Sequence, residues 1–294
     1  MMFERLRLAG AGLADGEIAL ARRAGRGGTV VFCHANGLNA SAYRPMLDAL
    51  DIHEAILAPD ARGHGRTRLA AAPRALTSWT RYADDLAAIL AAVAPEPPLT
   101  LVGHSMGAVT ALLAAASGPP PARLVMIEPV VVPRLARLGA RLPVPGLMPR
   151  LVPIARRAAR RRAAWPDVAA ARDALGRSAF FGRWDPAALA GYLDDGLVAS
   201  PNGVRLSCEP AWEAASFAAQ AHRFWRPLRR TLERGVPVHV LHAETGSTVP
   251  ADAARRLALA GCAVTRAGGD HMLPLHRPAD AAAFVRLALR GGWV

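Results

Sequence analysis

Five consecutive residues, Gly103-His104-Ser105-Met106-Gly107, have the types and spacing of a nucleophilic serine held in a tight turn. Between a strand and a helix, such a serine adopts a strained conformation with its hydroxyl exposed, and the two glycines give the room that this needs. It can attack a carbonyl carbon, while the backbone N–H of Met106 binds the oxygen that becomes negative. Ser105 is therefore a candidate nucleophile, and the alternative is an ordinary exposed serine in a turn.

Two other places supply groups that a nucleophilic serine would need. His271, in Gly268-Gly269-Asp270-His271-Met272-Leu273-Pro274, follows one apolar run, precedes the last helical pattern and comes after the serine in chain order. Neutral imidazole accepts a proton readily near neutral pH, so His271 is the candidate general base. Asn36, in His34-Ala35-Asn36-Gly37, offers a second backbone N–H to the oxyanion, although it could also be a simple turn residue.

The polar turn Pro59-Asp60-Ala61-Arg62-Gly63-His64-Gly65 follows another apolar run. Its glycines allow a tight backbone, and loop histidines are more often structural than reactive. We therefore expect this turn to support the site, with His64 outside the chemistry.

The elements around these residues alternate between apolar strands and helices, which predicts an α/β protein with a doubly wound, mostly parallel sheet. In such a sheet the reacting groups gather at the carboxyl ends of the strands. The expected strands are 3–8, 17–21, 29–33, 55–58, 99–102, 124–127, 236–241 and 263–265, and the expected helices are 41–50, 78–93, 106–116, 252–260 and 278–289.

Residues 133–235 depart from this alternation. They are rich in arginine and alanine, are broken by prolines and aromatics, and contain no strong strand pattern. We expect a helical insertion before the last two strands, which divides the chain into a core of residues 1–132 and 236–294 and a cap of residues 133–235. Most of its aromatic side chains should pack within the cap, and some could line an apolar pocket for an acyl chain.

The chain has 294 residues and a net charge of +13, which would ordinarily favour binding to nucleic acid or to an anionic surface. All 36 basic residues are arginine, however, and alanine is abundant, as GC-rich coding also produces. The arginines between Arg134 and Arg183 are better explained by a solvated helical face than by an acidic partner. We expect a small-molecule substrate and no nucleic acid, whereas the choice between monomer and homodimer stays open.

The remaining composition predicts a soluble, cytoplasmic protein. The first residues lack the apolar core of a signal peptide, and no apolar run approaches the twenty residues of a membrane span, so we expect no stable membrane insertion. Cys33, Cys208 and Cys262 are too scattered for a zinc site, and an odd count does not suggest a disulfide framework. We expect three small buried side chains, no metal and no organic cofactor.

Taken in chain order, the loop 34–37, the turn 60–65, the serine turn 103–107 and the segment 269–272 resemble the α/β-hydrolase superfamily. The resemblance covers nearly everything outside residues 133–235. It implies the α/β-hydrolase fold, a cap above the active site, Ser105 as nucleophile, His271 as base, and the N–H groups of Asn36 and Met106 as the oxyanion hole. One departure is His34-Ala35, where members usually have His-Gly.

The carboxylate that orients the histidine is the larger departure from the family pattern. Members usually carry an aspartate shortly after the strand that follows the cap, as Gly-x-x-Asp, but this chain reads Ala243-Glu244-Thr245-Gly246 there. Glu128 ends the strand before the cap, where some members place their acid. We therefore expect Glu128, with Glu244 as the alternative acid, and Asp252, Asp270 or no acid at all as further alternatives. Glu128 could also be a purely structural carboxylate.

The predicted function is that of a serine hydrolase, most simply a carboxylesterase for small or medium apolar esters. Serine at this turn argues against dehalogenase and epoxide hydrolase chemistry, because those relatives use aspartate. The same groups could instead cleave a carbon–carbon bond, a thioester or a lactone, since a fold does not fix a function. A non-catalytic binding protein of the same fold is the third possibility, and the missing aspartate supports it.

Overall fold

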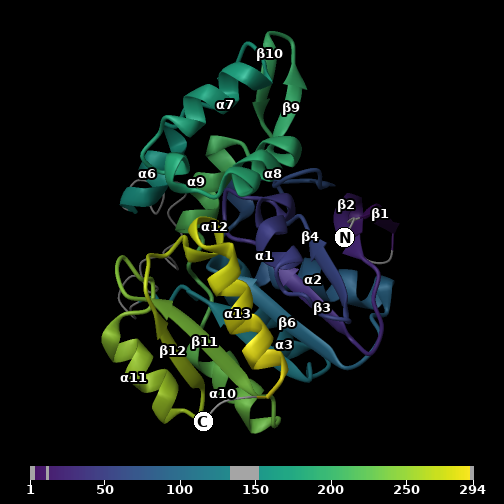
Figure 1. Ribbon diagram of the computed structural model, residues 1–294. Helices are drawn as coiled ribbons and strands as arrows, with labels where there is room; N and C mark the ends of the chain where they lie inside the picture. Colours follow the sequence, from purple (N-terminus) through teal and green to yellow (C-terminus); the bar gives the residue numbers. More distant parts are fainter. Residues whose placement is uncertain (1–3, 11–12, 133–151, 292–294) are drawn as a thin grey trace.

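The computed structural model describes residues 4–10, 13–132 and 152–291. A nine-stranded sheet runs through this part of the chain in the order β1-β2-β4-β3-β6-β7-β11-β12, and the short β5 pairs with β2 (Figure 1). The strands are β1 (Glu4–Gly10), β2 (Leu13–Arg23), β3 (Thr29–Cys33), β4 (Ala55–Pro59), β5 (Arg68–Leu69), β6 (Leu99–His104), β7 (Arg123–Ile127), β11 (Val238–Ala243) and β12 (Ala263–Ala267).

All neighbouring strands from β4 to β12 in this order are parallel, whereas β1 and β5 pair antiparallel with β2, and β2 pairs antiparallel with β4. The predicted fold class, a doubly wound and mostly parallel sheet, is therefore confirmed. Helices cover both faces of a parallel sheet, so a central strand is buried on both sides. All five residues of β3 are buried, which accounts for its continuous apolar run.

Helices lie on both faces of the sheet (Figure 1). They are η1 (Ala40–Tyr43), α1 (Arg44–Asp48), η2 (Pro73–Ala75), α2 (Thr80–Val93), α3 (Met106–Ser117), α10 (Trp225–Glu233), α11 (Ala251–Leu259), α12 (Leu273–His276) and α13 (Pro278–Leu289). Along β3, Val31 joins a hydrophobic cluster with Leu112 of α3, and Val30 joins another with Val285 of α13. Successive strand side chains point to opposite faces, so these clusters are the two halves of the core.

A second group of elements lies beyond one end of the sheet (Figure 1). It comprises α6 (Pro153–Ala159), β8 (Ala164–Trp165), α7 (Val168–Gly176), η3 (Phe181–Arg183), α8 (Pro186–Gly196), β9 (Leu197–Ser200), β10 (Gly203–Leu206) and α9 (Pro210–Ala218). The sequence pattern predicted no strong strand in this region. That prediction is wrong, because β8, β10 and β9 form an antiparallel sheet. These strands have two to four residues, too few for a readable alternation.

The division into core and cap stays a prediction, because its first boundary borders residues 133–151, which lie outside the described residues. Helix α10 lies just before the second predicted boundary, which is at residue 235. It falls inside the predicted cap, yet it packs against α3, and its Leu228 shares the hydrophobic cluster of Leu112. This packing favours a cap that ends near residue 224 instead of 235. No helix among the described residues is long and apolar enough to span a membrane.

Candidate active site

The serine turn joins β6 to α3. Strand β6 ends at His104 and α3 begins at Met106, which leaves Ser105 between them with φ 56° and ψ −116°. This is a sparsely populated conformation for a residue with a side chain, and the N–H of Ser105 supports it by donating to the Ile127 carbonyl at 2.9 Å. A side chain at Gly107 would overlap the backbone after β3, so glycine lets α3 approach the sheet.

His271 lies between β12 and α12 and faces the serine. Its Nε2 is 3.0 Å from Ser105 Oγ, and its side chain is 24 % exposed. The loop that carries it is held by Thr245, whose N–H and hydroxyl both donate to the Gly269 carbonyl, at 3.1 and 2.9 Å. Residues 166 positions apart in the sequence thus meet at hydrogen-bond distance, as a nucleophile and its base require.

Glu128 follows β7 and lies on the other side of the imidazole. Its Oε2 is 2.8 Å from His271 Nδ1, and the glutamate is 1 % exposed. Its Oε1 accepts from the Ala243 N–H and the Ser247 hydroxyl, both at 2.6 Å, and Oε2 accepts from the Thr248 N–H at 2.9 Å. The carboxylate is thus held by three residues besides the histidine.

These contacts decide the charge of Glu128. Burial by itself raises the pKa of a carboxyl group, but the hydrogen bond and charge of His271 and the donors Ser247 and Ala243 outweigh it, lowering the pKa of Glu128 to about 2. The group is therefore an anion at neutral pH. An anion beside Nδ1 keeps a proton on that nitrogen, which leaves Nε2 free to accept the serine proton.

The other expected carboxylates are engaged elsewhere. Glu244 has a side chain 55 % exposed, and it pairs with Arg266 at 3.1 Å. Asp270 pairs with Arg183 and His276, both at 3.0 Å. Among the described residues, the carboxylate at hydrogen-bond distance from His271 is that of Glu128, so the geometry favours the first of the two glutamates that the sequence offered.

Asn36 lies in the loop after β3, next to the serine turn, because Cys33 pairs with Gly103 across β3 and β6. Its side-chain Nδ2 donates to the Glu213 carbonyl of α9 at 3.1 Å, and the following N–H of Gly37 donates to His64 at 2.9 Å. The loop is therefore fixed from two sides. The oxyanion hole formed by the N–H groups of Asn36 and Met106 stays a prediction.

His64 accepts a hydrogen bond from the loop that contains Asn36. Burial and the nearby His34 lower the pKa of His64 to about 3, so its ring is neutral. Its Nδ1 donates to the Arg62 carbonyl at 2.9 Å, and Nε2 accepts from Gly37, which assigns the tautomer. Arg62 is itself anchored by a buried two-point ion pair with Asp85, at 2.6 and 2.9 Å. The structural role expected for this turn agrees with these contacts.

His104 is a positioning residue that the sequence reasoning missed. Its Nε2 donates to the backbone carbonyl of His271 at 2.8 Å, and its Nδ1 accepts from the Tyr43 hydroxyl at 2.6 Å. The Tyr43 oxygen accepts in turn from the Ala35 N–H at 3.2 Å. Burial lowers the pKa of His104 to about 3, so the ring is neutral. The signal was its place directly before the serine, at the end of β6.

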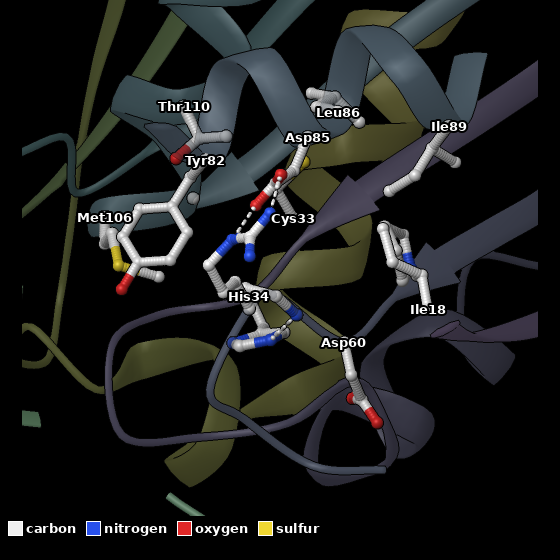
Figure 2. A pocket seen from close by; sticks show the side chains of 14 residues that line it. Ile18, Cys33, His34, Asp60, Tyr82, Asp85, Leu86, Ile89, Met106 and Thr110 are labelled. Carbon is white, nitrogen blue, oxygen red and sulfur yellow. Dashed lines mark hydrogen bonds and ion pairs between the residues drawn. The ribbon is translucent and has the colours of Figure 1, made fainter. Parts of the chain in front are cut away.

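A small cavity lies beneath the serine turn, between β3, α2 and α3 (Figure 2). Its volume is about 30 Å³, which is the space of one water molecule. Met106 and His34 line it, but Ser105 and His271 do not. This cavity is therefore a gap in the packing and not a place for a substrate.

The described residues contain no group of three or more His, Cys, Asp or Glu side chains placed to hold a metal ion. Cys33, Cys208 and Cys262 are buried free thiols, and their burial confirms the prediction of small buried side chains.

With this geometry established, comparison with known proteins identifies the family. The sequence profile of the alpha/beta hydrolase family matches residues 30–284. The chain belongs to this family. Lipase LipV of Mycobacterium tuberculosis is similar to this alpha/beta hydrolase, with 31% identity over 253 residues that cover 80% of this chain and 83% of the lipase.

Solved structures agree on the fold. The alpha/beta hydrolase superposes on E-2-(acetamidomethylene)succinate hydrolase with a TM-score of 0.76, 20% identity, and coverage of 98% of this chain and 99% of the other. The thioesterase domain from the curacin biosynthetic pathway gives a TM-score of 0.73, 18% identity, and coverage of 97% and 99%. At such identities the likeness concerns the fold alone.

Proposed function

We propose that this alpha/beta hydrolase is a serine hydrolase that cleaves carboxylic esters of small or medium, mainly apolar acids. The observation that carries the proposal is the continuous row from Glu128 through His271 to Ser105, with separations of 2.8 and 3.0 Å. A relative that is named a lipase supports an ester as the bond cleaved.

The reaction begins when Ser105 Oγ attacks the ester carbonyl while His271 Nε2 takes its proton. The anionic Glu128 stabilises the imidazolium, and the N–H groups of Asn36 and Met106 bind the oxyanion. His271 then returns the proton to the leaving alcohol, which leaves an acyl group on Ser105. Water attacks this acyl-enzyme with His271 again as base, and the acid is released.

The same attack would open a thioester, a lactone or an activated carbon–carbon bond, and these remain alternatives. The non-catalytic alternative rested on the glycine at position 246, where relatives usually have aspartate. Glu128 weakens it, because a buried anion with a lowered pKa already occupies the Nδ1 side of His271.

A fluorophosphonate probe tests the proposal directly, because it labels only activated serines. We expect labelling of the wild type and of Ser207→Ala, and none of Ser105→Ala. Hydrolysis of 4-nitrophenyl butanoate should fall by about 10⁴-fold or more in Ser105→Ala. An unlabelled wild-type protein, or labelling that survives in Ser105→Ala, would contradict the proposal.

A further inference from the structure

The cap contains a cavity of about 420 Å³, lined by residues of α6, β8, α7 and α9 and the segment 178–181. Clefts of this size are typical of small-molecule sites. Aromatic side chains form much of its wall, and Ile154 and Phe180, each 49 % exposed, line it as well. The cavity is thus apolar and open to a ligand.

Helix α6 presents one face to this cavity. Ile154, Arg157 and Ala158 line it, with the spacing of three and four residues that marks one side of a helix, and Arg161 and Arg162 line it from the segment that follows α6. Arg156 and Arg160 do not line the cavity. A ligand in the cavity would therefore contact Arg157 and Arg161 but not Arg156 and Arg160.

The arginines that line the cavity differ in whether a carboxylate neutralises their charge. Arg161 pairs with Glu213 at 2.8 Å. Arg162 lies over the Trp165 ring at 5.5 Å, and its Nε donates to the Ala164 carbonyl. Among the described residues, neither Arg157 nor Arg162 has a carboxylate partner. Within the described part of the chain, two positive charges without a carboxylate partner thus border an apolar cavity, which suits a molecule with an apolar chain and an anionic end.

The cavity is next to the candidate active site. Glu213 lines it and also packs on the oxyanion loop, since its carbonyl accepts from Asn36 and a Cβ placed on Gly37 would lie 2.5 Å from its Oε1. Glu213 is therefore shared by the wall of the cavity and the loop that would hold the reacting carbonyl.

We propose that the cap cavity binds the acyl chain of a substrate whose far end carries a carboxylate, with Arg157 and Arg162 binding that carboxylate. This rests on the proposed serine hydrolase function and narrows its substrate from an apolar ester to the half-ester of a dicarboxylic acid. The paired Arg161 and Glu213 form the inner wall, where they fix the cavity against the oxyanion loop.

Two esters of equal chain length test the proposal: 4-nitrophenyl hydrogen octanedioate, which carries a free carboxylate, and its methyl ester, which is uncharged. We expect the wild type to prefer the charged ester by at least about tenfold in kcat/KM. The double variant Arg157→Gln/Arg162→Gln should reduce this preference to about twofold or less. Equal rates for the two esters in the wild type would overturn the proposal.

Arg156→Gln/Arg160→Gln is the matched control, because it removes the same charge from the same part of the chain. It should keep the preference. If it loses the preference as fully as the cavity variant does, long-range attraction of anions explains the effect and the assignment of Arg157 and Arg162 is wrong.

Binding of monomethyl octanedioate and dimethyl octanedioate to Ser105→Ala, measured by calorimetry, separates the two proposals. Tighter binding of the monoanion, lost in the background of Arg157→Gln/Arg162→Gln, supports the cavity even if the wild type hydrolyses neither ester. Equal binding of both compounds, with hydrolysis of both by the wild type, overturns the cavity proposal and leaves the serine hydrolase proposal intact.

Discussion

Glu128 and Glu244 each follow one of two adjacent parallel strands, β7 and β11, yet they have opposite surroundings. Glu128 is 1 % exposed and meets His271 and donors from three further residues. The side chain of Glu244 is 55 % exposed and meets Arg266 at the surface. Position at a strand end therefore brings a carboxylate near the site but does not make it part of the site.

The backbone accounts for the difference. Glu128 has φ 51°, an unusual value for a residue with a side chain, and its N–H donates to the Leu241 carbonyl at 2.7 Å. This turns the chain back toward the end of β11. The segment after β11, where relatives usually carry the acid, here provides donors from Ala243, Ser247 and Thr248 that hold the acid of the neighbouring strand.

Replacing each glutamate by glutamine tests directly which of the two supports His271. An amide beside Nδ1 can favour the wrong imidazole tautomer, and such losses reach about 10⁴-fold in serine proteases. In Glu128→Gln we expect kcat for 4-nitrophenyl butanoate to fall by about 10³- to 10⁴-fold. Glu244→Gln, the matched control, should stay within about twofold of the wild type. The reverse ranking of the two variants would make Glu244 the acid.

The sequence predicted the core of this site because each of its motifs is local. The pattern around Ser105, the strand before it, the helix after it and the two glycines before His271 are all readable within a few residues. The distinction between Glu128 and Glu244 is not local, since it depends on donors more than 100 positions away. For the same reason the link from Tyr43 through His104 to His271 could not be predicted. Strands β8, β9 and β10 could not be predicted for a different reason, because two to four residues are too few to show an alternating pattern.

The two glutamates should also differ in how they make the stability of the protein depend on pH. The pKa of Glu128 is lowered from 4.5 to about 2 in the folded protein, so its ionised form contributes on the order of 3 kcal/mol above pH 4.5. This contribution is lost as the pH falls from about 4.5 toward 2. Urea unfolding between pH 6 and pH 3 should therefore show a steeper loss of stability in the wild type and Glu244→Gln than in Glu128→Gln. If all three proteins lose stability equally steeply as the pH falls, the ionised Glu128 does not make this contribution.

A smaller loss is expected at Ser247, which contacts no reacting atom. Its Oγ contacts Glu128 and also accepts from the Val249 N–H at 3.0 Å. Its hydroxyl donates to Oε1 at 2.6 Å, and the loss of one hydrogen bond to a buried anion costs about 1 to 1.5 kcal/mol when part of the bonding is replaced. Ser247→Ala should lower kcat about five- to tenfold with KM unchanged, because substrate binding does not use this bond. Ser247→Thr, which keeps the hydroxyl, should recover most of the rate, whereas Ser117→Ala, the same change at the far end of α3, should have no effect. A rise in KM with unchanged kcat would mean that Ser247 serves the shape of the loop after β11 instead of the charge on Glu128. The contrast between the two glutamates would then rest on burial and on the bonds of Glu128 with His271, Ala243 and Thr248.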